Sequence, residues 1–226
     1  MKRHIIIAIV AALALALIIP TACAKSEKGT LPNLNIGDKW VYKVMSESTE
    51  YTMTLEVTGE DVTDGKDCYM MRGLFEPPAL GAISGVSLKL DKATMFTLRM
   101  EMLLSTDLIG DLFEMSSSYS YEIPGKPYYP LEMGKECEVI ETEIKISYTM
   151  GWPQKQTMTD TYTYTVERIA EITVPAGTFR CFKIVKYDKS GNAVSTYWTS
   201  DEVKHEVKVI DHVNEETTEL VSYSIH

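Results

Sequence analysis

Cysteine and histidine are both scarce in this chain, with only four of each among 226 residues. No Cys-x-x-Cys pair and no Cys/His cluster occurs, so we expect neither a structural zinc site nor a disulfide-dense scaffold. The motifs G-x-S-x-G, H-E-x-x-H, the Walker loop and G-x-G-x-x-G are absent too. The sequence therefore predicts no catalytic residue, no metal site and no cofactor.

Basic residues are outnumbered by acidic ones. The chain has 22 lysines and arginines against 32 aspartates and glutamates, which gives a formal net charge of −10 at pH 7. A surface of this sign repels phosphate backbones, so nucleic acid is excluded as a partner. Hydrophobic residues make up 45% of the chain, enough for a buried core, which excludes an intrinsically disordered protein.

The N-terminus has the layout of an export signal. Lys2 and Arg3 precede an apolar run over residues 5–19, and small residues follow that run. The run is shorter than the roughly 20 residues of a membrane-spanning helix, although an uncleaved anchor that reaches residue 24 is an alternative. We predict a signal peptide over residues 1–22.

Two cleavage sites compete at the end of this signal. The segment Ile19–Cys23 resembles a bacterial lipobox, which would leave Cys23 as a diacylated first residue ahead of a polar tether over residues 23–30. Pro20 departs from that pattern, which usually has Leu three places before the Cys. Cleavage after Ala24 would instead release a soluble, secreted protein. We favour the lipobox and predict Cys23 as a lipidation site that anchors the protein to a membrane outside the cytoplasm.

Three cysteines remain after the signal, Cys68, Cys137 and Cys181. An oxidising compartment would permit one disulfide among them and leave one free thiol. The alternative is that all three are small buried hydrophobic residues.

Much of the chain alternates apolar and polar residues with a period of two, which is typical of a β-strand with one buried face. Turn residues separate the runs, as at Asp64-Gly65. The clearest runs cover residues 51–58, 96–102, 161–166 and 203–209, and the other turns fall at residues 175–177 and 190–192. This pattern predicts a mainly β fold: an antiparallel curved sheet, as a half-barrel or a sandwich, with at most one or two short helices. The segment Asp107–Phe113 is the candidate for helical turns.

The two halves of the chain echo each other weakly. Residues 36–42 resemble residues 133–139, and residues 67–70 around Cys68 resemble residues 180–183 around Cys181. Coincidence between two strand-and-turn patterns is the alternative. We predict one β-rich domain over residues 31–226, made of two lobes that share one core, with the lobes at about 31–123 and 128–226.

Several short motifs in this order resemble a family of secreted or lipid-anchored microbial β-proteins known as TapB-like proteins or as domains of unknown function. The Val-Pro-Ala-Gly-Thr-Phe block is the most specific of these motifs. They are Ile36–Trp40, Tyr129–Gly134, Val174–Phe179, Tyr197-Trp198 and Val207-Lys208. The resemblance spans nearly all the chain after the signal, and it implies a β fold and an envelope location without implying an activity. Cys137 stands where a Trp would complete the echo of Trp40.

Methionine and aromatic side chains on the predicted strand faces mark a possible apolar groove. Flexible thioethers suit an adaptable cavity for a lipid or an acyl chain, whereas ordinary core packing is the alternative. The candidate lining residues are Tyr51, Met53, Leu55, Phe96, Met100, Met102 and Val207. His205 lies on an apolar face, where we interpret it as a core histidine bonded to a tyrosine. His212 is an odd number of residues away, which excludes a shared metal site unless a bulge intervenes.

These observations favour a non-catalytic binding or structural module at the cell envelope, anchored by an N-terminal lipid. Its partner would be an envelope protein or an apolar ligand. A Lol-like carrier that holds lipid or acyl chains in its groove is the alternative, and an envelope hydrolase is the least favoured reading because no nucleophile and base can be assigned.

Overall fold

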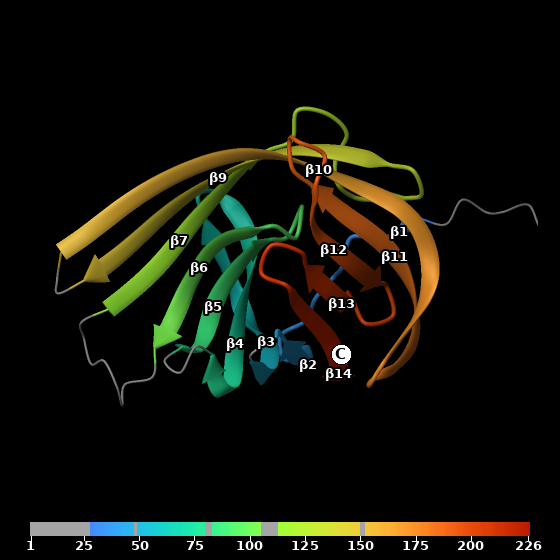
Figure 1. Cartoon of the computed structure of the whole chain (residues 1–226), viewed down its shortest axis with the longest axis horizontal. Coiled ribbons are helices and arrows are strands. Elements are labelled where there is room, and N and C mark those ends of the chain that lie inside the picture. Colours follow the sequence, from blue (N-terminus) through green and yellow to red (C-terminus); the bar gives the residue numbers. More distant parts are fainter. Residues whose placement is uncertain (1–27, 48, 80–82, 105–112, 150–151) are drawn as a thin grey trace, which may run out of the picture.

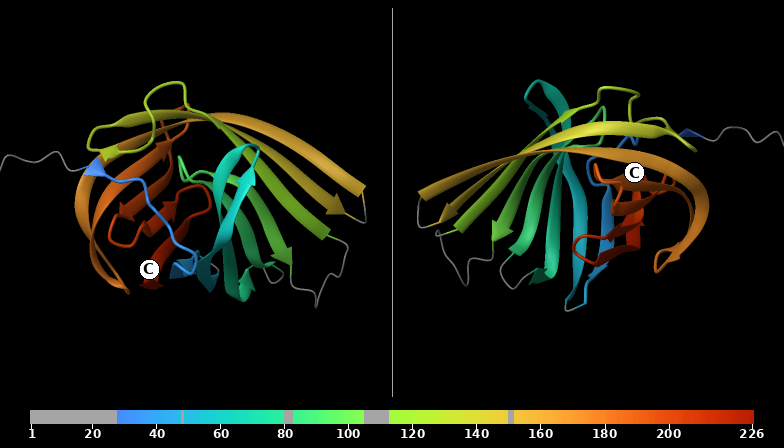
Figure 2. Two further views of the ribbon diagram at one scale, coloured as in Figure 1. Left: turned by 180° about the vertical axis from the view of Figure 1, so that it is seen from behind. Right: turned by 45° about the horizontal axis from the view of Figure 1, so that its top comes forward.

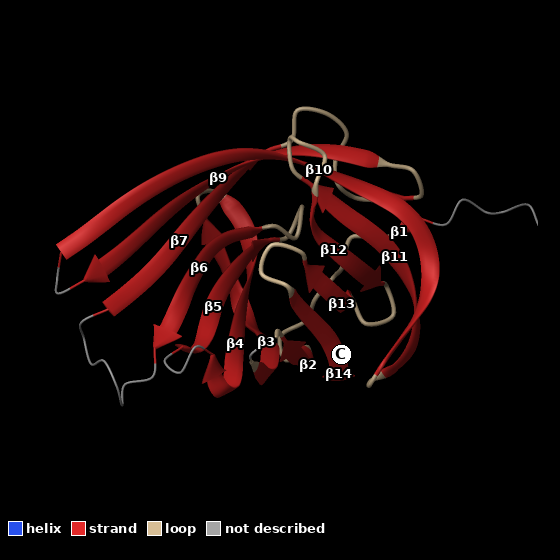
Figure 3. Ribbon diagram, viewed as in Figure 1, coloured by secondary structure: helices blue, strands red, loops and turns tan. Residues whose placement is uncertain are grey.

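Strands make up the regular structure of the computed structural model, which describes residues 28–47, 49–79, 83–104, 113–149 and 152–226. Figure 3 shows strands and loops, and no helix, in this part of the chain. The strands are β1 (Lys28–Gly29), β2 (Lys39–Met45), β3 (Glu50–Thr63), β4 (Lys66–Ala79), β5 (Ile83–Asp91), β6 (Thr97–Leu104), β7 (Phe113–Glu122), β8 (Leu131–Glu132), β9 (Glu136–Thr149), β10 (Trp152–Val174), β11 (Gly177–Tyr187), β12 (Ala193–Ser200), β13 (His205–Asp211) and β14 (Glu216–Ser224). The predicted signal peptide, Cys23 and the predicted helical turns before Phe113 lie outside the described residues.

Twelve of these strands form one closed antiparallel barrel, in the order β10-β11-β12-β13-β14-β2-β3-β4-β5-β6-β7-β9. The barrel closes because β14 pairs with β2 and β9 pairs with β10. Figure 1 shows the long strands β9 and β10 arching over the molecule, with β3–β7 on one side and β11–β14 on the other. The predicted mainly β, antiparallel fold is confirmed. The sequence pattern predicted a half-barrel or a sandwich, and the structure shows that the sheet closes into a barrel.

The weak echo between the two halves corresponds to a repeated set of backbone hydrogen bonds. Before β2, the Gly37 N–H donates to the Val57 carbonyl at 2.8 Å, and the Val57 N–H donates to the Asp38 carbonyl at 2.9 Å. Before β9, the same two bonds join Gly134 to Val166 at 2.8 Å and Val166 to Lys135 at 2.9 Å. Both glycines have a positive φ, 93° and 76°, which an L side chain rarely adopts. The echo therefore reflects one turn geometry used twice.

The core lies inside the barrel, because directly paired residues on neighbouring strands project to the same face of the sheet. Trp40 pairs with Leu55 and Tyr42 pairs with Met53, and the first three of these side chains are buried. A first cluster of buried residues joins both halves of the chain, from Leu34 to Leu220. A second cluster, which includes Leu131, lies under β9–β11. Both lobes predicted from the sequence thus contribute to the first cluster.

The two ends of the described chain are fastened to the barrel. Asp38 is fully buried, and its carboxylate accepts the His226 N–H at 2.7 Å and the Asn35 N–H at 2.9 Å. Figure 2 shows the segment before β2 running across the end of the barrel from β1. There Lys28 and Gly29, at the end of the predicted polar tether, pair with β8.

The turns follow the glycine signals. Asp64 and Gly65 both have positive φ, 52° and 77°, which is the geometry of a tight hairpin between β3 and β4. Cys68, Cys137 and Cys181 are all buried and free. The structure therefore agrees with three buried thiols and shows no disulfide among them.

Candidate functional site

The predicted groove residues are divided between two places inside the barrel. Leu55 and Val207 belong to the first core cluster, and Met53 packs against it. Phe96 packs instead against the second cluster. The ring of Tyr51 lies edge-on to Phe75, 5.4 Å between centroids, and its hydroxyl donates to Glu216 at 3.3 Å. These residues therefore do not form one continuous lining.

The two remaining groove candidates, Met100 and Met102, lie on β6. Met100 pairs with Leu88 and Met102 pairs with Val86, so all four side chains face the inside of the barrel. All four are half-buried. These four apolar side chains therefore remain partly accessible to solvent on the inner face of the barrel.

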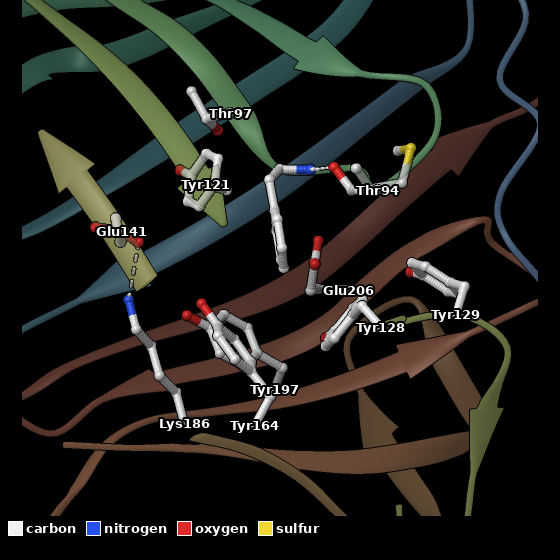
Figure 4. Close-up of a pocket in the computed structure, with 12 residues that line it drawn as sticks. Thr94, Thr97, Tyr121, Tyr128, Tyr129, Glu141, Tyr164, Lys186, Tyr197 and Glu206 are labelled. Carbon is white, nitrogen blue, oxygen red and sulfur yellow. Dashed lines mark hydrogen bonds and ion pairs between the residues drawn. The ribbon is translucent and has the colours of Figure 1, made fainter. Parts of the chain in front are cut away.

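A cavity of about 280 Å³ lies inside the barrel, on the same inner face. It is near the lower end of small-molecule pockets, which span roughly 300–1,000 Å³. Aromatic rings form much of its wall, and three charged side chains, two threonines and one methionine complete it (Figure 4). Its lining residues are Thr94, Met95, Phe96, Thr97, Tyr121, Tyr128, Tyr129, Glu141, Tyr164, Lys186, Tyr197 and Glu206. We call this cavity the aromatic pocket.

A tight turn between β5 and β6 holds Phe96 in this pocket. The Met95 N–H donates to the Asp91 carbonyl at 2.7 Å, and the Asp91 N–H donates to the Phe96 carbonyl at 2.9 Å. Met95 adopts a positive φ of 63°, an unfavourable conformation for a side chain of its kind. The Phe96 ring then lies 4.8 Å from Tyr121 and 5.3 Å from Tyr128, measured between centroids.

The other aromatic rings come from three strands and one loop. Tyr164 on β10 lies 5.4 Å from Tyr128, which belongs to the loop between β7 and β8. Tyr197 on β12 stacks with Tyr164 at 6.5 Å, and Tyr129 meets Tyr128 edge-on at 5.0 Å. Offset and edge-on pairs at these distances are favourable beyond the area that they bury. The rings therefore support one another, with Tyr128 at their centre.

Two of the charged side chains in the pocket form an ion pair. The Lys186 Nζ is 3.5 Å from the Glu141 Oε2, as the dashed line in Figure 4 marks. Glu141 pairs with Tyr121 across β9 and β7, and Lys186 pairs with Tyr164 across β11 and β10, so all four side chains share the inner face. The same ammonium lies 3.7 Å above the ring of Tyr162. The protein thus already holds one cation against an aromatic surface at this site.

Glu206 is the third charged group. Its Oε2 is 2.5 Å from the His205 Nδ1, and the His205 ring lies tilted against Trp40 with 4.8 Å between ring centroids. Burial opposes ionisation of this carboxyl, but the charge and hydrogen bond of His205 hold the pKa of Glu206 below its usual range. Glu206 is therefore a carboxylate at neutral pH, and the pocket lining carries two acidic groups against one basic group.

The phenols of the pocket stay protonated. Burial raises the pKa of Tyr197 to about 12 and raises the pKa of Tyr128 and Tyr164 well above the usual value. Within the described part of the chain, the hydroxyls of Tyr128 and Tyr164 make no hydrogen bond with another residue. They are neutral groups that can donate to or accept from a ligand.

The interpretation of His205 as a histidine bonded to a tyrosine is confirmed, because its Nδ1 lies 2.9 Å from the Tyr42 hydroxyl. His212 bonds the Thr196 hydroxyl at 2.8 Å. Over the described ranges, no group of three or more His, Cys, Asp or Glu residues is arranged to hold a metal ion. No helix in the same ranges has the length and apolar character needed to cross a membrane.

Sequence reasoning found Phe96 in this pocket but missed the other eleven lining residues. They come from one turn, one loop and seven separate strands, and only tertiary pairing brings them together. One signal was present. The chain has 13 tyrosines against 5 phenylalanines, a surplus of rings with a polar tip, which suits a half-polar cavity wall better than a dry core.

No protein-family model matches this chain, and no curated protein matches it. Two solved structures are similar to it. A candidate lipoprotein from Parabacteroides distasonis is 14% identical with a TM-score of 0.39, and the match covers 88% of this chain and 100% of the other. A candidate exported protein with a YmcC-like fold from Bacteroides fragilis is 9% identical with a TM-score of 0.39, covering 87% and 99%. The resemblance to the TapB-like family, which no family model supports, stays a prediction.

Proposed function

We propose that this chain is a non-catalytic binding protein that takes a small ligand into the aromatic pocket of its barrel. The pocket itself is the observation that carries the proposal. Six aromatic rings that pack against one another, Phe96 among them, line a space of about 280 Å³ inside a closed barrel. Concave sites where aromatic side chains meet a few fixed polar groups are a usual form of ligand-binding site.

The chemistry of the pocket supports binding over catalysis. Its phenols are held protonated by burial, and Lys186 is paired with Glu141. Glu206 is bonded to His205, which leaves the pocket without a nucleophile next to a base. Fixed protonation states and mutual packing are properties of a preformed site that holds a ligand without changing it.

A library of small metabolites tests this proposal by thermal shift on the whole chain in a maltoside detergent. We expect ligands that raise the melting temperature of the wild type and lose this effect in Tyr128→Leu and Tyr197→Leu. Tyr187→Leu is the matched control, because the Tyr187 hydroxyl donates to Glu167 and its side chain lies outside the pocket. A library without any binder, or binders that are indifferent to both pocket substitutions, would overturn the proposal.

The proposed location is the outer side of a membrane, with the barrel held there by lipid on Cys23. The lipobox at residues 19–23 supports this proposal. Intact mass of the protein purified from its own cells tests it, because diacylation of Cys23 adds lipid mass. A free N-terminus at Lys25 would contradict lipid anchoring and favour a secreted protein.

A second candidate function, a carrier of lipid or acyl chains, is favoured by the inner face of β5 and β6. Val86, Leu88, Met100 and Met102 face inward there and stay half-buried. Mass spectrometry of an organic extract of the purified protein tests this function. Stoichiometric lipid that is lost in Met100→Gln would support a carrier, and extracts without lipid would contradict it.

A further inference from the structure

The walls of the aromatic pocket specify the charge of the ligand as well as its size. The lining has two carboxylates, Glu141 and Glu206, and one ammonium, that of Lys186. Lys186 is the partner of Glu141 at 3.5 Å. Glu206 pairs with His205, a neighbour outside the lining, so the side chains that face the cavity carry more negative than positive charge.

The aromatic rings add to this preference for positive charge. The face of an aromatic ring is the negative end of its quadrupole and attracts cations, and a desolvated site strengthens the attraction. The contact of Lys186 with Tyr162, 3.7 Å from ammonium to ring centroid, shows this attraction within the chain itself. Figure 4 shows the Glu206 side chain among the rings of Tyr128, Tyr164 and Tyr197. A ligand between these rings would meet ring faces and a carboxylate together.

We infer that the aromatic pocket binds an organic ammonium cation, held by the rings of Tyr128, Tyr164 and Tyr197 and by the carboxylate of Glu206. This inference rests on the proposed function and names its ligand class. A compact cation such as a trimethylammonium group suits a space of about 280 Å³. A sugar would also stack on the rings and donate hydroxyl hydrogen bonds to the carboxylate, but it would gain no charge–charge attraction from it.

Paired probes of equal shape test the inference on the whole chain in maltoside detergent. Choline carries the positive nitrogen, whereas 3,3-dimethylbutan-1-ol has a carbon in its place and is neutral. Titration calorimetry at pH 7 compares the two. We expect choline to bind at least about tenfold more tightly. Equal affinities, or binding by the neutral alcohol alone, would overturn the inference.

A charge-removing variant adds a second measurement. Glu206→Gln is expected to weaken choline binding at least about fivefold and to leave the affinity for the neutral alcohol unchanged. Glu216→Gln is the matched control, because it removes the same charge from the inner face of the barrel near Tyr51, away from the pocket lining. Equal weakening by both substitutions would contradict a direct role for Glu206, since it would reflect net charge alone.

The source of the cation is distinguished by a third probe, glycerophosphocholine, which carries the same ammonium on a lipid headgroup without acyl chains. Tighter binding than choline would assign the site to a lipid headgroup, and weaker binding to a free ammonium compound. Both results support the inference. If choline, tetramethylammonium and putrescine all fail to bind while a library compound binds through Tyr128, the ligand class is wrong and the proposed function stands. If no compound binds, both the proposed function and the inferred ligand class are wrong.

Discussion

Burial sets the chemistry of the cysteines residue by residue. Cys181 is fully buried in the first core cluster, where desolvation and the nearby Glu202 raise the pKa of its thiol to about 12. Burial also raises the pKa of Cys137, while Cys68 is fully buried on β4. Because the thiolate is the reactive form, these side chains are inert hydrophobic residues in the folded protein.

Thiol counting therefore reports on folding and on lipidation at once. At pH 8 a thiol with a pKa of about 12, as in Cys181, is ionised in only about one molecule in ten thousand. Cys68 and Cys137 are buried away from a reagent, so we expect none of the three to react with a disulfide reagent in the native state. In urea all three should react within minutes. A fourth reactive thiol would be that of an unmodified Cys23, and its absence would indicate either a modified sulfur or cleavage after Ala24, which intact mass distinguishes. Fast reaction of Cys181 in the native protein would contradict its burial.

Some residues of the aromatic pocket could be predicted from the sequence, and others could not. Phe96 and Tyr164 were visible as apolar members of alternating runs, and both reach the pocket. Tyr128 lies in a loop without any periodicity, and Glu206 lies on a strand where an acidic residue normally faces solvent. The bulge between β12 and β13 changes the register next to Glu206, and no sequence pattern marks it.

Among the elements, β4 and β5 approach each other more closely than ordinary side chains would permit. A Cβ at Gly85 would lie 2.2 Å from the Gly73 carbonyl oxygen, and a Cβ at Gly73 would lie 2.9 Å from a methyl group of Val86. The two glycines lie near each other across the β4–β5 pair, next to its irregular stretch after Leu74. The barrel wall bends at a point where only backbone can fit.

Substitution at this contact is expected to be costly. Gly85→Ala should lower the free energy of unfolding by about 2–3 kcal/mol, because backbone atoms must move to admit the methyl group. Urea denaturation followed by circular dichroism measures the change. Gly125→Ala is the control, because a Cβ there would meet nothing within 4 Å, and its effect should stay within about 0.5 kcal/mol. A similar cost at both positions would show that the close contact is not the reason for the cost at Gly85.

The strands were predictable because period-two alternation is local, and the hairpin turn at Asp64-Gly65 is fixed by residues that tolerate positive φ. Closure of the sheet was not predictable in this way. The pairing of Trp40 with Tyr223 joins residues far apart in the chain, and many registers would satisfy the same alternation. The repeated turn at Gly37 and Gly134 was predictable only in part. The sequence similarity of the two segments was evident, but their shared hydrogen bonds are seen only in the three-dimensional structure.

For the whole molecule, closure of the barrel makes the two halves of the chain interdependent. The first core cluster packs Trp40 and Met71 from the first half with Cys181 and Val207 from the second. Residues near Gly125 connect the halves in an exposed loop between β7 and β8. Neither half can cover its part of the core alone, so we expect one cooperative unfolding transition.

Cutting the chain in this loop tests that dependence. Fragments that end at Gly125 and begin at Lys126 should each lack β-sheet circular dichroism when expressed alone, because each exposes two unpaired strand edges and half of the shared core. Expressed together, they should form a complex whose sheet signal and single melting transition match those of the intact chain. A cut chain that keeps choline binding would show in addition that the loop's covalent continuity is not required to hold Tyr128 in the pocket. A fragment that folds alone, or two separate melting transitions, would mean that the halves are independent domains and that the shared core contributes little to stability.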